Sequence, residues 1–143
     1  MKALYTAEVT AQGGRGGHVK SQDGVLNMEL AKPESMGGEG KEGTNPEQLF
    51  AAAWGPCFLG ALGTVAKKQN VDLGDTKIIV KVSFNEEDNG YALSAALNVI
   101  DESVEDDVLN ELVQKTQQVC PYSKATAGNI DVTVTANKIE VEV

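Results

Sequence analysis

The chain has little positive charge, and this shortage excludes several classes of partner. Its 143 residues include 21 acidic and 12 basic side chains, which gives a net charge of −9. Nucleic acids and anionic membrane surfaces bind proteins through clusters of lysine and arginine. We therefore expect neither as a partner, and the acidity favours solubility.

Sequence features of secretion and membrane insertion are also missing. Residues 1–10 alternate polar and apolar side chains, without the apolar core or small-residue cleavage site of a signal peptide. The longest apolar stretch, residues 49–66, is interrupted by glycines, a proline and a threonine and has polar flanks. This pattern predicts no membrane span, and a cytoplasmic location follows as the default.

Cysteine and histidine are scarce. Two cysteines, Cys57 and Cys120, are too few for a disulfide framework, and such a pair is most often two small buried hydrophobic side chains. A zinc site would need both cysteines, the single His18 and a carboxylate to converge, and no ligand spacing supports this. We therefore interpret His18 as a strand or surface residue, and we expect no metal and no cofactor.

Length and composition indicate a single domain, residues 1–143, because no repeat or low-complexity linker divides the chain. The predicted order is three strands, a helix, two strands, a helix and two strands, which is an α+β fold with antiparallel sheet. The dipeptide Asn89-Gly90 predicts a hairpin turn. The predicted strands are residues 3–10, 18–22, 25–30, 76–85, 91–100, 130–136 and 139–143.

The first predicted helix covers residues 46–69. Asn45 can cap it, Pro46 suits its first position, and Gln48 has the spacing of a capping box. The helix is apolar on all sides, and such helices are normally buried completely. Since a domain of this size has little room for that, we infer that a second subunit covers it.

The second predicted helix begins after Ser103, which we expect to act as its cap, and ends at Cys120-Pro121. Acidic residues in its first turn favour the positive end of the helix dipole. The carboxylates between Asp101 and Asp107 do not have the spacing of an EF-hand, so a metal site is not expected there. A short turn is predicted at residues 123–127.

Arg15 is the only arginine, since eleven of the twelve basic residues are lysine, and it stands between two glycine pairs. Arginine is needed where a permanent charge and forked donors must meet a carboxylate or a thiolate. A guanidinium favours the thiolate form of a cysteine, and a carboxylate such as Glu47 can orient it. The alternative interpretation is an exposed loop arginine.

Five segments follow one another in a specific order: Gly13-Gly14-Arg15-Gly16-Gly17-His18-Val19, Asp23-Gly24-Val25-Leu26, Thr44-Asn45-Pro46-Glu47-Gln48-Leu49-Phe50-Ala51-Ala52, Cys57-Phe58 and Cys120-Pro121-Tyr122-Ser123-Lys124-Ala125-Thr126. Together they resemble the organic hydroperoxide resistance (Ohr) branch of the OsmC/Ohr family over essentially the whole chain. Tyr122 and the Gln48-Leu49-Phe50 run resemble this branch more than the OsmC branch.

The resemblance implies an intertwined homodimer in which antiparallel sheets wrap around two long central helices. It also implies a thiol peroxidase, without haem or metal, that reduces organic or fatty-acid hydroperoxides to alcohols. Cys57 matches the peroxidatic cysteine, Cys120 the resolving one, and Arg15 and Glu47 the pair that activates the thiolate and holds the peroxide. A Cys57 sulfenic acid would give a Cys57–Cys120 disulfide, which a dithiol such as the dihydrolipoyl group of a lipoylated protein would reduce.

The run Trp54-Gly55-Pro56 departs from the family, whose members commonly carry a tyrosine and small residues before the first cysteine. Pro56 cannot donate to the carbonyl of Ala52, so we expect a kink. The kink either displaces the thiolate or starts a new helical segment whose N-terminus helps to ionise Cys57. We expect retained activity, with Trp54 in the pocket wall, because all four matched polar positions are present.

Helix geometry predicts a shared site. Glu47 and Cys57 are ten residues apart, about 15 Å along a continuous helix. Each site is therefore expected to take at least one of Arg15 and Glu47 from the neighbouring subunit; otherwise Glu47 contacts Arg15 and leaves Cys57 to Arg15 alone. Two other functions stay open: an OsmC-type peroxidase with broader substrates, and a non-catalytic protein that binds hydrophobic small molecules.

Overall fold

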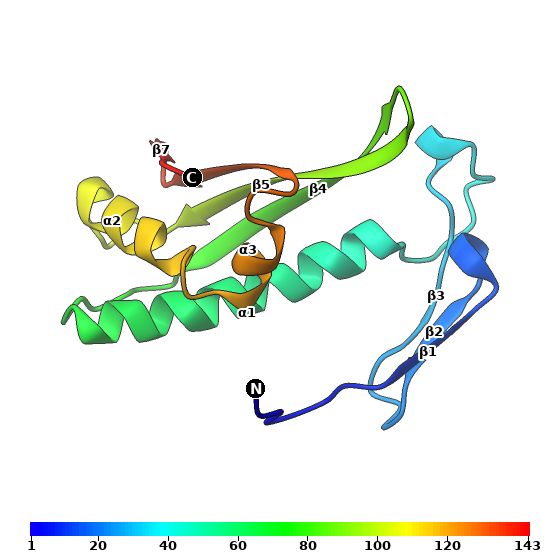
Figure 1. Cartoon of the computed structure of the whole chain (residues 1–143), viewed down its shortest axis with the longest axis horizontal. Coiled ribbons are helices and arrows are strands. Elements are labelled where there is room, and N and C mark those ends of the chain that lie inside the picture. The colour runs from blue at the N-terminus through cyan, green and yellow to red at the C-terminus, as the bar shows by residue number, and fades with distance from the viewer. The chain divides into compact units, whose positions relative to one another are not determined.

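The computed structural model describes residues 1–143 and is an α+β structure with two sheets. The chain forms two compact units, Met1–Leu49 and Phe50–Val143. Figure 1 shows the elements in chain order: β1 (Val9–Gln12), η1 (Gly14–Gly16), β2 (His18–Ser21), β3 (Asn27–Glu29), η2 (Glu34–Met36), α1 (Pro46–Lys68), β4 (Lys77–Glu87), β5 (Gly90–Ile100), α2 (Asp106–Thr116), α3 (Pro121–Thr126), β6 (Asp131–Ala136) and β7 (Ile139–Val141).

The N-terminal unit contains a three-stranded antiparallel sheet of order β1-β2-β3. Two of its predicted strands are confirmed as β2 and β3, but the strand predicted over residues 3–10 is wrong in extent. Residues 1–8 are exposed and lie outside the sheet, apart from the Glu8 carbonyl, which accepts a hydrogen bond from the backbone N–H of Gln22 at 2.9 Å; β1 begins only at Val9. Between β1 and β2 the chain turns through Gly13, at φ 84°, and Gly17, where a Cβ would collide with the carbonyl oxygen of Gln12.

The C-terminal unit is built on a four-stranded sheet of order β4-β5-β6-β7. The predicted hairpin is confirmed, but its turn lies one residue before Asn89-Gly90. Glu87 pairs with Gly90, so Asp88 and Asn89 are the two turn residues. The expectation of purely antiparallel sheet is wrong for one pair, because β5 and β6 run parallel. Two helices, α2 and α3, connect these strands and carry the chain back to the same end of the sheet, as a parallel pair requires.

Helix α1 confirms the prediction to within one residue. The backbone N–H of Gln48 donates to Asn45 Oδ1 at 2.8 Å, which is the expected N-terminal cap. The helix continues through Pro56, so no new helical segment begins before Cys57. By length and composition alone α1 could cross a membrane, but Trp54 and Phe58 are fully buried in the hydrophobic cluster of this unit, which makes α1 a core helix.

The region after β5 corrects two predictions. Ser103 does not cap a helix, because its hydroxyl donates to Asp101 Oδ1 at 2.6 Å, and α2 begins only at Asp106. The helix also ends at Thr116 rather than at Cys120. Residues 123–127, expected to form a turn, lie mostly in the short helix α3, which Pro121 starts at its first position.

Asp101 is a buried carboxylate that joins the end of β5 to the segment before β4. Its oxygens accept hydrogen bonds from the backbone N–H of Gly74 at 2.7 Å, from Thr76 Oγ1 at 2.6 Å, and from both the N–H and the hydroxyl of Ser103 at 3.0 and 2.6 Å. Burial raises the pKa of Asp101, but the hydrogen bonds outweigh it and the pKa is lowered. The carboxylate therefore stays charged inside the fold.

Candidate active site

Arg15 and Glu47 form a forked ion pair within the N-terminal unit. Arg15 lies in η1, and Glu47 lies in the first turn of α1. Arg15 Nη1 donates to Glu47 Oε2 at 2.9 Å and Arg15 Nη2 donates to Glu47 Oε1 at 2.7 Å. The side chains are 33% and 14% exposed, so Arg15 is not a free loop arginine. The hydrogen bonds lower the pKa of Glu47 and raise that of Arg15, so both groups are charged at neutral pH.

Cys57 and Cys120 form the second pair, within the C-terminal unit. Cys57 is half-buried on α1, and Cys120 is fully buried and directly precedes α3. Both are free thiols, and the Cys120 thiol donates to Cys57 Sγ across 3.7 Å. A disulfide bond is about 2.05 Å long, so a small movement of either side chain could join the two sulfurs.

The surroundings of Cys57 in this unit favour the thiol form. Burial raises the pKa of Cys57, and repulsion between two neighbouring thiolates, at Cys57 and Cys120, raises it further. The backbone N–H of Tyr122 acts in the opposite direction but does not cancel these effects. The thiolate is the nucleophilic form of a cysteine, and a positive charge close to Cys57 would favour it.

A hydrogen bond that the sequence did not reveal connects the two segments that carry the cysteines. Trp54 Nε1 donates to Ser123 Oγ at 3.1 Å, and both residues are buried. Trp54 precedes Cys57 by three residues and Ser123 follows Cys120 by three, spacings that place each pair on one side of its segment. This repeated spacing is the only sequence signal that could have indicated the contact.

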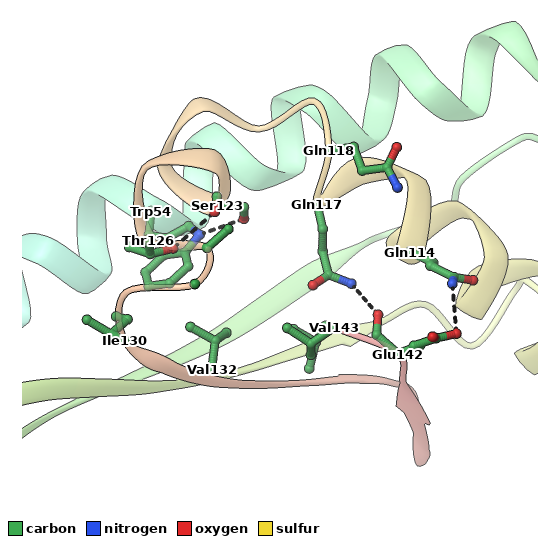
Figure 2. A pocket seen from close by; sticks show the side chains of 13 residues that line it. Trp54, Gln114, Gln117, Gln118, Ser123, Thr126, Ile130, Val132, Glu142 and Val143 are labelled. Atoms are coloured by element: carbon green, nitrogen blue, oxygen red, sulfur yellow. Dashed lines mark hydrogen bonds between the residues drawn. The ribbon is translucent and has the colours of Figure 1, made fainter.

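Beside this hydrogen bond lies a cavity of about 310 Å³ between α3, α2 and the sheet (Figure 2). Trp54 forms one wall of this cavity, which neither cysteine lines. At the rim, Gln117 Nε2 donates to the backbone oxygen of Glu142 at 2.9 Å. Gln114 Nε2 donates to Oε2 of the same residue at 3.3 Å, so both amides are hydrogen-bonded. The remaining lining residues are Gln118, Ser123, Thr126, Ala127, Gly128, Ile130, Val132, Val134 and Val143.

A second hollow, of about 500 Å³, runs between the outer side of α1 and β4. Its lining is apolar except for one threonine and one lysine: Ala51, Ala52, Gly55, Pro56, Leu59, Thr76, Lys77, Ile78 and Val80. Phe58 is fully buried in the core, and Phe50 packs edge to face on Trp54 with ring centroids 5.7 Å apart.

His18 is a strand residue, as expected. It lies on β2 and its Nε2 atom is 3.9 Å from Oε1 of Glu29 on the neighbouring strand. No three side chains of the His, Cys, Asp and Glu types are grouped in a way that could hold a metal ion.

Comparisons with known proteins agree over nearly the whole chain. Residues 38–135 match the family described as OsmC-like protein. The organic hydroperoxide resistance protein OhrB of Bacillus subtilis (strain 168) is 48% identical over 132 residues, covering 91% of this chain and 96% of that protein. The organic hydroperoxide resistance protein of Xanthomonas axonopodis pv. citri (strain 306) is 44% identical over 135 residues, covering 94% of this chain and 95% of that protein.

Solved structures give the same result for the fold. The crystal structure of OhrB of Bacillus subtilis has a TM-score of 0.88 and 44% identity, covering 94% of this chain and 100% of that one. The crystal structure of a putative organic hydroperoxide resistance protein of Vibrio cholerae, with captopril bound in one of its active sites, has a TM-score of 0.91 and 39% identity. The match covers 99% of this chain and 97% of that one.

Proposed function

This chain belongs to the OsmC family, its relatives are organic hydroperoxide resistance proteins, and we propose that it is a cysteine-based peroxidase that reduces organic hydroperoxides to alcohols. The observation that carries the proposal is the pair of free thiols, Cys57 and Cys120, with their sulfurs 3.7 Å apart. An accessible sulfur beside a buried second thiol suits a peroxidatic and a resolving cysteine.

The proposed reaction has two steps at these sulfurs. The Cys57 thiolate attacks the terminal oxygen of the hydroperoxide; a sulfur–oxygen bond forms, the oxygen–oxygen bond breaks, and the departing alkoxide takes up a proton to give the alcohol. The Cys120 sulfur then displaces the hydroxyl group from the Cys57 sulfenic acid, forming the disulfide and releasing water. A dithiol, for which we propose the dihydrolipoyl group of a lipoylated protein, reduces the disulfide.

We assign the activation of Cys57 to Arg15. The neighbours of Cys57 within its own unit raise its pKa, so a cation is needed to form the thiolate near neutral pH. Arg15 is the only arginine, and Glu47 holds both of its terminal nitrogens in one direction. A guanidinium oriented in this way can face a thiolate and a bound peroxide oxygen together.

We further propose an intertwined homodimer in which residues 1–143 of each subunit act as one OsmC/Ohr-like domain. Only 33% of the most apolar 18-residue stretch of α1 is buried within the chain, and Leu4 and Tyr5 are 91% and 82% exposed. A second subunit would cover these surfaces. Because Arg15 and Glu47 act as a pair, we propose that both reach Cys57 of the neighbouring subunit. The proposed location is the cytoplasm.

Mass spectrometry after one equivalent of cumene hydroperoxide tests the function. The wild-type protein should become two hydrogens lighter, with the disulfide between Cys57 and Cys120, and should release the alcohol. Cys120→Ala should instead become one oxygen heavier, at Cys57. Unchanged protein mass with unconsumed peroxide would contradict the proposal, and a co-purified lipid with unchanged cysteines would favour the non-catalytic binding function.

The choice between an Ohr-type and a broader OsmC-type substrate range is tested by comparing peroxides. The Ohr-type assignment predicts a larger kcat/KM for cumene or fatty-acid hydroperoxide than for hydrogen peroxide, because an alkyl tail adds apolar burial. Equal values for all three would support the OsmC-type peroxidase.

A further inference from the structure

The short helix α3, which follows Cys120, has few contacts that hold it in place. It is six residues long, and only Ser123 and Thr126 among them are buried. The Thr126 hydroxyl donates within α3, to the carbonyl oxygens of Tyr122 at 3.0 Å and of Ser123 at 3.2 Å. Ser123 is therefore the only side chain of α3 with a hydrogen bond to another element, and its partner is Trp54 of α1.

The position of this hydrogen bond matches the position of the cysteines. One turn separates Trp54 from Cys57 along α1, and three residues separate Cys120 from Ser123. The hydrogen bond of 3.1 Å, the sulfur pair at 3.7 Å and the hydrogen bond from the backbone N–H of Tyr122 to Cys57 are therefore neighbouring connections between the same two segments. Since Trp54 is fully buried, α1 provides a fixed support for α3.

We propose that the Trp54–Ser123 hydrogen bond positions Cys120 for its condensation with the Cys57 sulfenic acid, a role that rests on the proposed peroxidase function. Trp54 and Ser123 are then positioning residues, because they act through the two cysteines. Without the hydrogen bond, α3 can shift into the cavity of about 310 Å³ that Ser123, Thr126 and Ala127 border (Figure 2). Forming the disulfide would then also require ordering of α3.

The test measures the thiol–disulfide equilibrium with glutathione, in the absence of peroxide. In this reaction the protein dithiol and glutathione disulfide give the protein disulfide and two molecules of glutathione. We expect Ser123→Ala to lower the equilibrium constant about threefold to tenfold, which corresponds to the net free energy of one hydrogen bond. A general loss of stability affects the reduced and oxidised proteins alike and cancels in this ratio.

Matched variants separate the hydrogen bond from other effects. Thr126→Val removes the other buried hydroxyl of α3, which has no bond to α1, and should change the constant less than twofold. Ser123→Thr keeps a hydroxyl and should restore most of the wild-type value. Trp54→Phe should resemble Ser123→Ala, and the double variant should be no worse than either single one, because both remove the same bond.

A kinetic measurement completes the test. With cumene hydroperoxide, Ser123→Ala should accumulate the Cys57 sulfenic acid, because condensation is slowed several-fold while oxidation of Cys57 is not. An unchanged equilibrium constant in Ser123→Ala, or an equal loss in Thr126→Val, would overturn the inference. Failure of the wild-type protein to consume peroxide would instead contradict the proposed function, and the glutathione equilibrium would still be measurable.

Discussion

Arg15 and Glu47 meet through two hydrogen bonds, of 2.9 and 2.7 Å, which join the two terminal nitrogens of the guanidinium to the two oxygens of the carboxylate. This geometry fixes the direction in which Arg15 presents its charge, and a lysine ammonium cannot reproduce it, because its charge is a single point on a flexible chain.

Arg15→Lys should lower kcat/KM for cumene hydroperoxide about 100-fold, the size of effect that loss of one oriented donor commonly has. The pKa of Cys57, measured from the pH dependence of its alkylation, should rise in the variant. Lys20→Met, an exposed charge on β2, is the control and should leave the rate unchanged. Equal activities of Arg15→Lys and the wild type would contradict the role of Arg15.

Sharing of the site between subunits can be tested by mixing two inactive variants, Arg15→Ala and Cys57→Ala. If Arg15 acts on Cys57 of the neighbouring subunit, each mixed dimer has one complete site. Random reassortment of equal amounts should then restore about one quarter of the wild-type activity. Activity that stays at the level of the separate variants would show that Arg15 acts within its own subunit.

Glu47→Gln should remove a contribution to stability that depends on pH. The pKa of Glu47 is lowered in the folded protein, so its pairing with Arg15 stabilises the fold above the unfolded pKa of about 4.3 and is lost as pH falls through the folded value. The melting temperature of the wild type should exceed that of Glu47→Gln at pH 6, and the gap should close towards pH 3. A gap independent of pH would contradict this account.

Asp101→Asn should destabilise the fold by about 2 kcal/mol at pH 7, because the four donors around Asp101 lose a charged acceptor. The pKa of Asp101 is also lowered, so its stabilising effect is present above the unfolded pKa of about 3.9 and disappears as pH falls through the folded value. Urea unfolding at pH 7, 5 and 3.5 should show the difference shrinking. The exposed Asp72→Asn should have little effect at any pH.

Local sequence signals predicted the elements that depend on neighbouring residues. The cap at Asn45 located the start of α1, and the alternation around Asn89-Gly90 located the β4–β5 hairpin, since both depend on residues a few positions apart. Distant contacts decided the elements that were missed. Asp101 binds Ser103 together with Thr76, 25 residues away from Asp101, and this contact takes Ser103 away from the expected helix cap.

The contacts of the candidate site also join residues far apart in the sequence. Arg15 and Glu47 are 32 residues apart and the two cysteines 63 apart, so the pairs were proposed from family motifs and not from local pattern. The hydrogen bond between Trp54 and Ser123 spans 69 residues. Ser123 lies in one of the family segments, but no motif links it to Trp54, so only the structure revealed the bond. The parallel pairing of β5 with β6 likewise depends on how α2 and α3 pack between them.

Because of Pro56, one backbone carbonyl oxygen of α1, that of Ala52, lacks its helical hydrogen-bond donor. Proline has no N–H, so the carbonyl oxygen of Ala52 lacks the donor that every regular turn of helix provides, and both residues line the apolar hollow beside β4. A purely aliphatic surface pressed against this side would leave that oxygen without a hydrogen bond, at a cost of about 1–3 kcal/mol. A surface that excluded water from this side of α1 would therefore need a hydrogen-bond donor at this point, and that need would restrict its position along the helix.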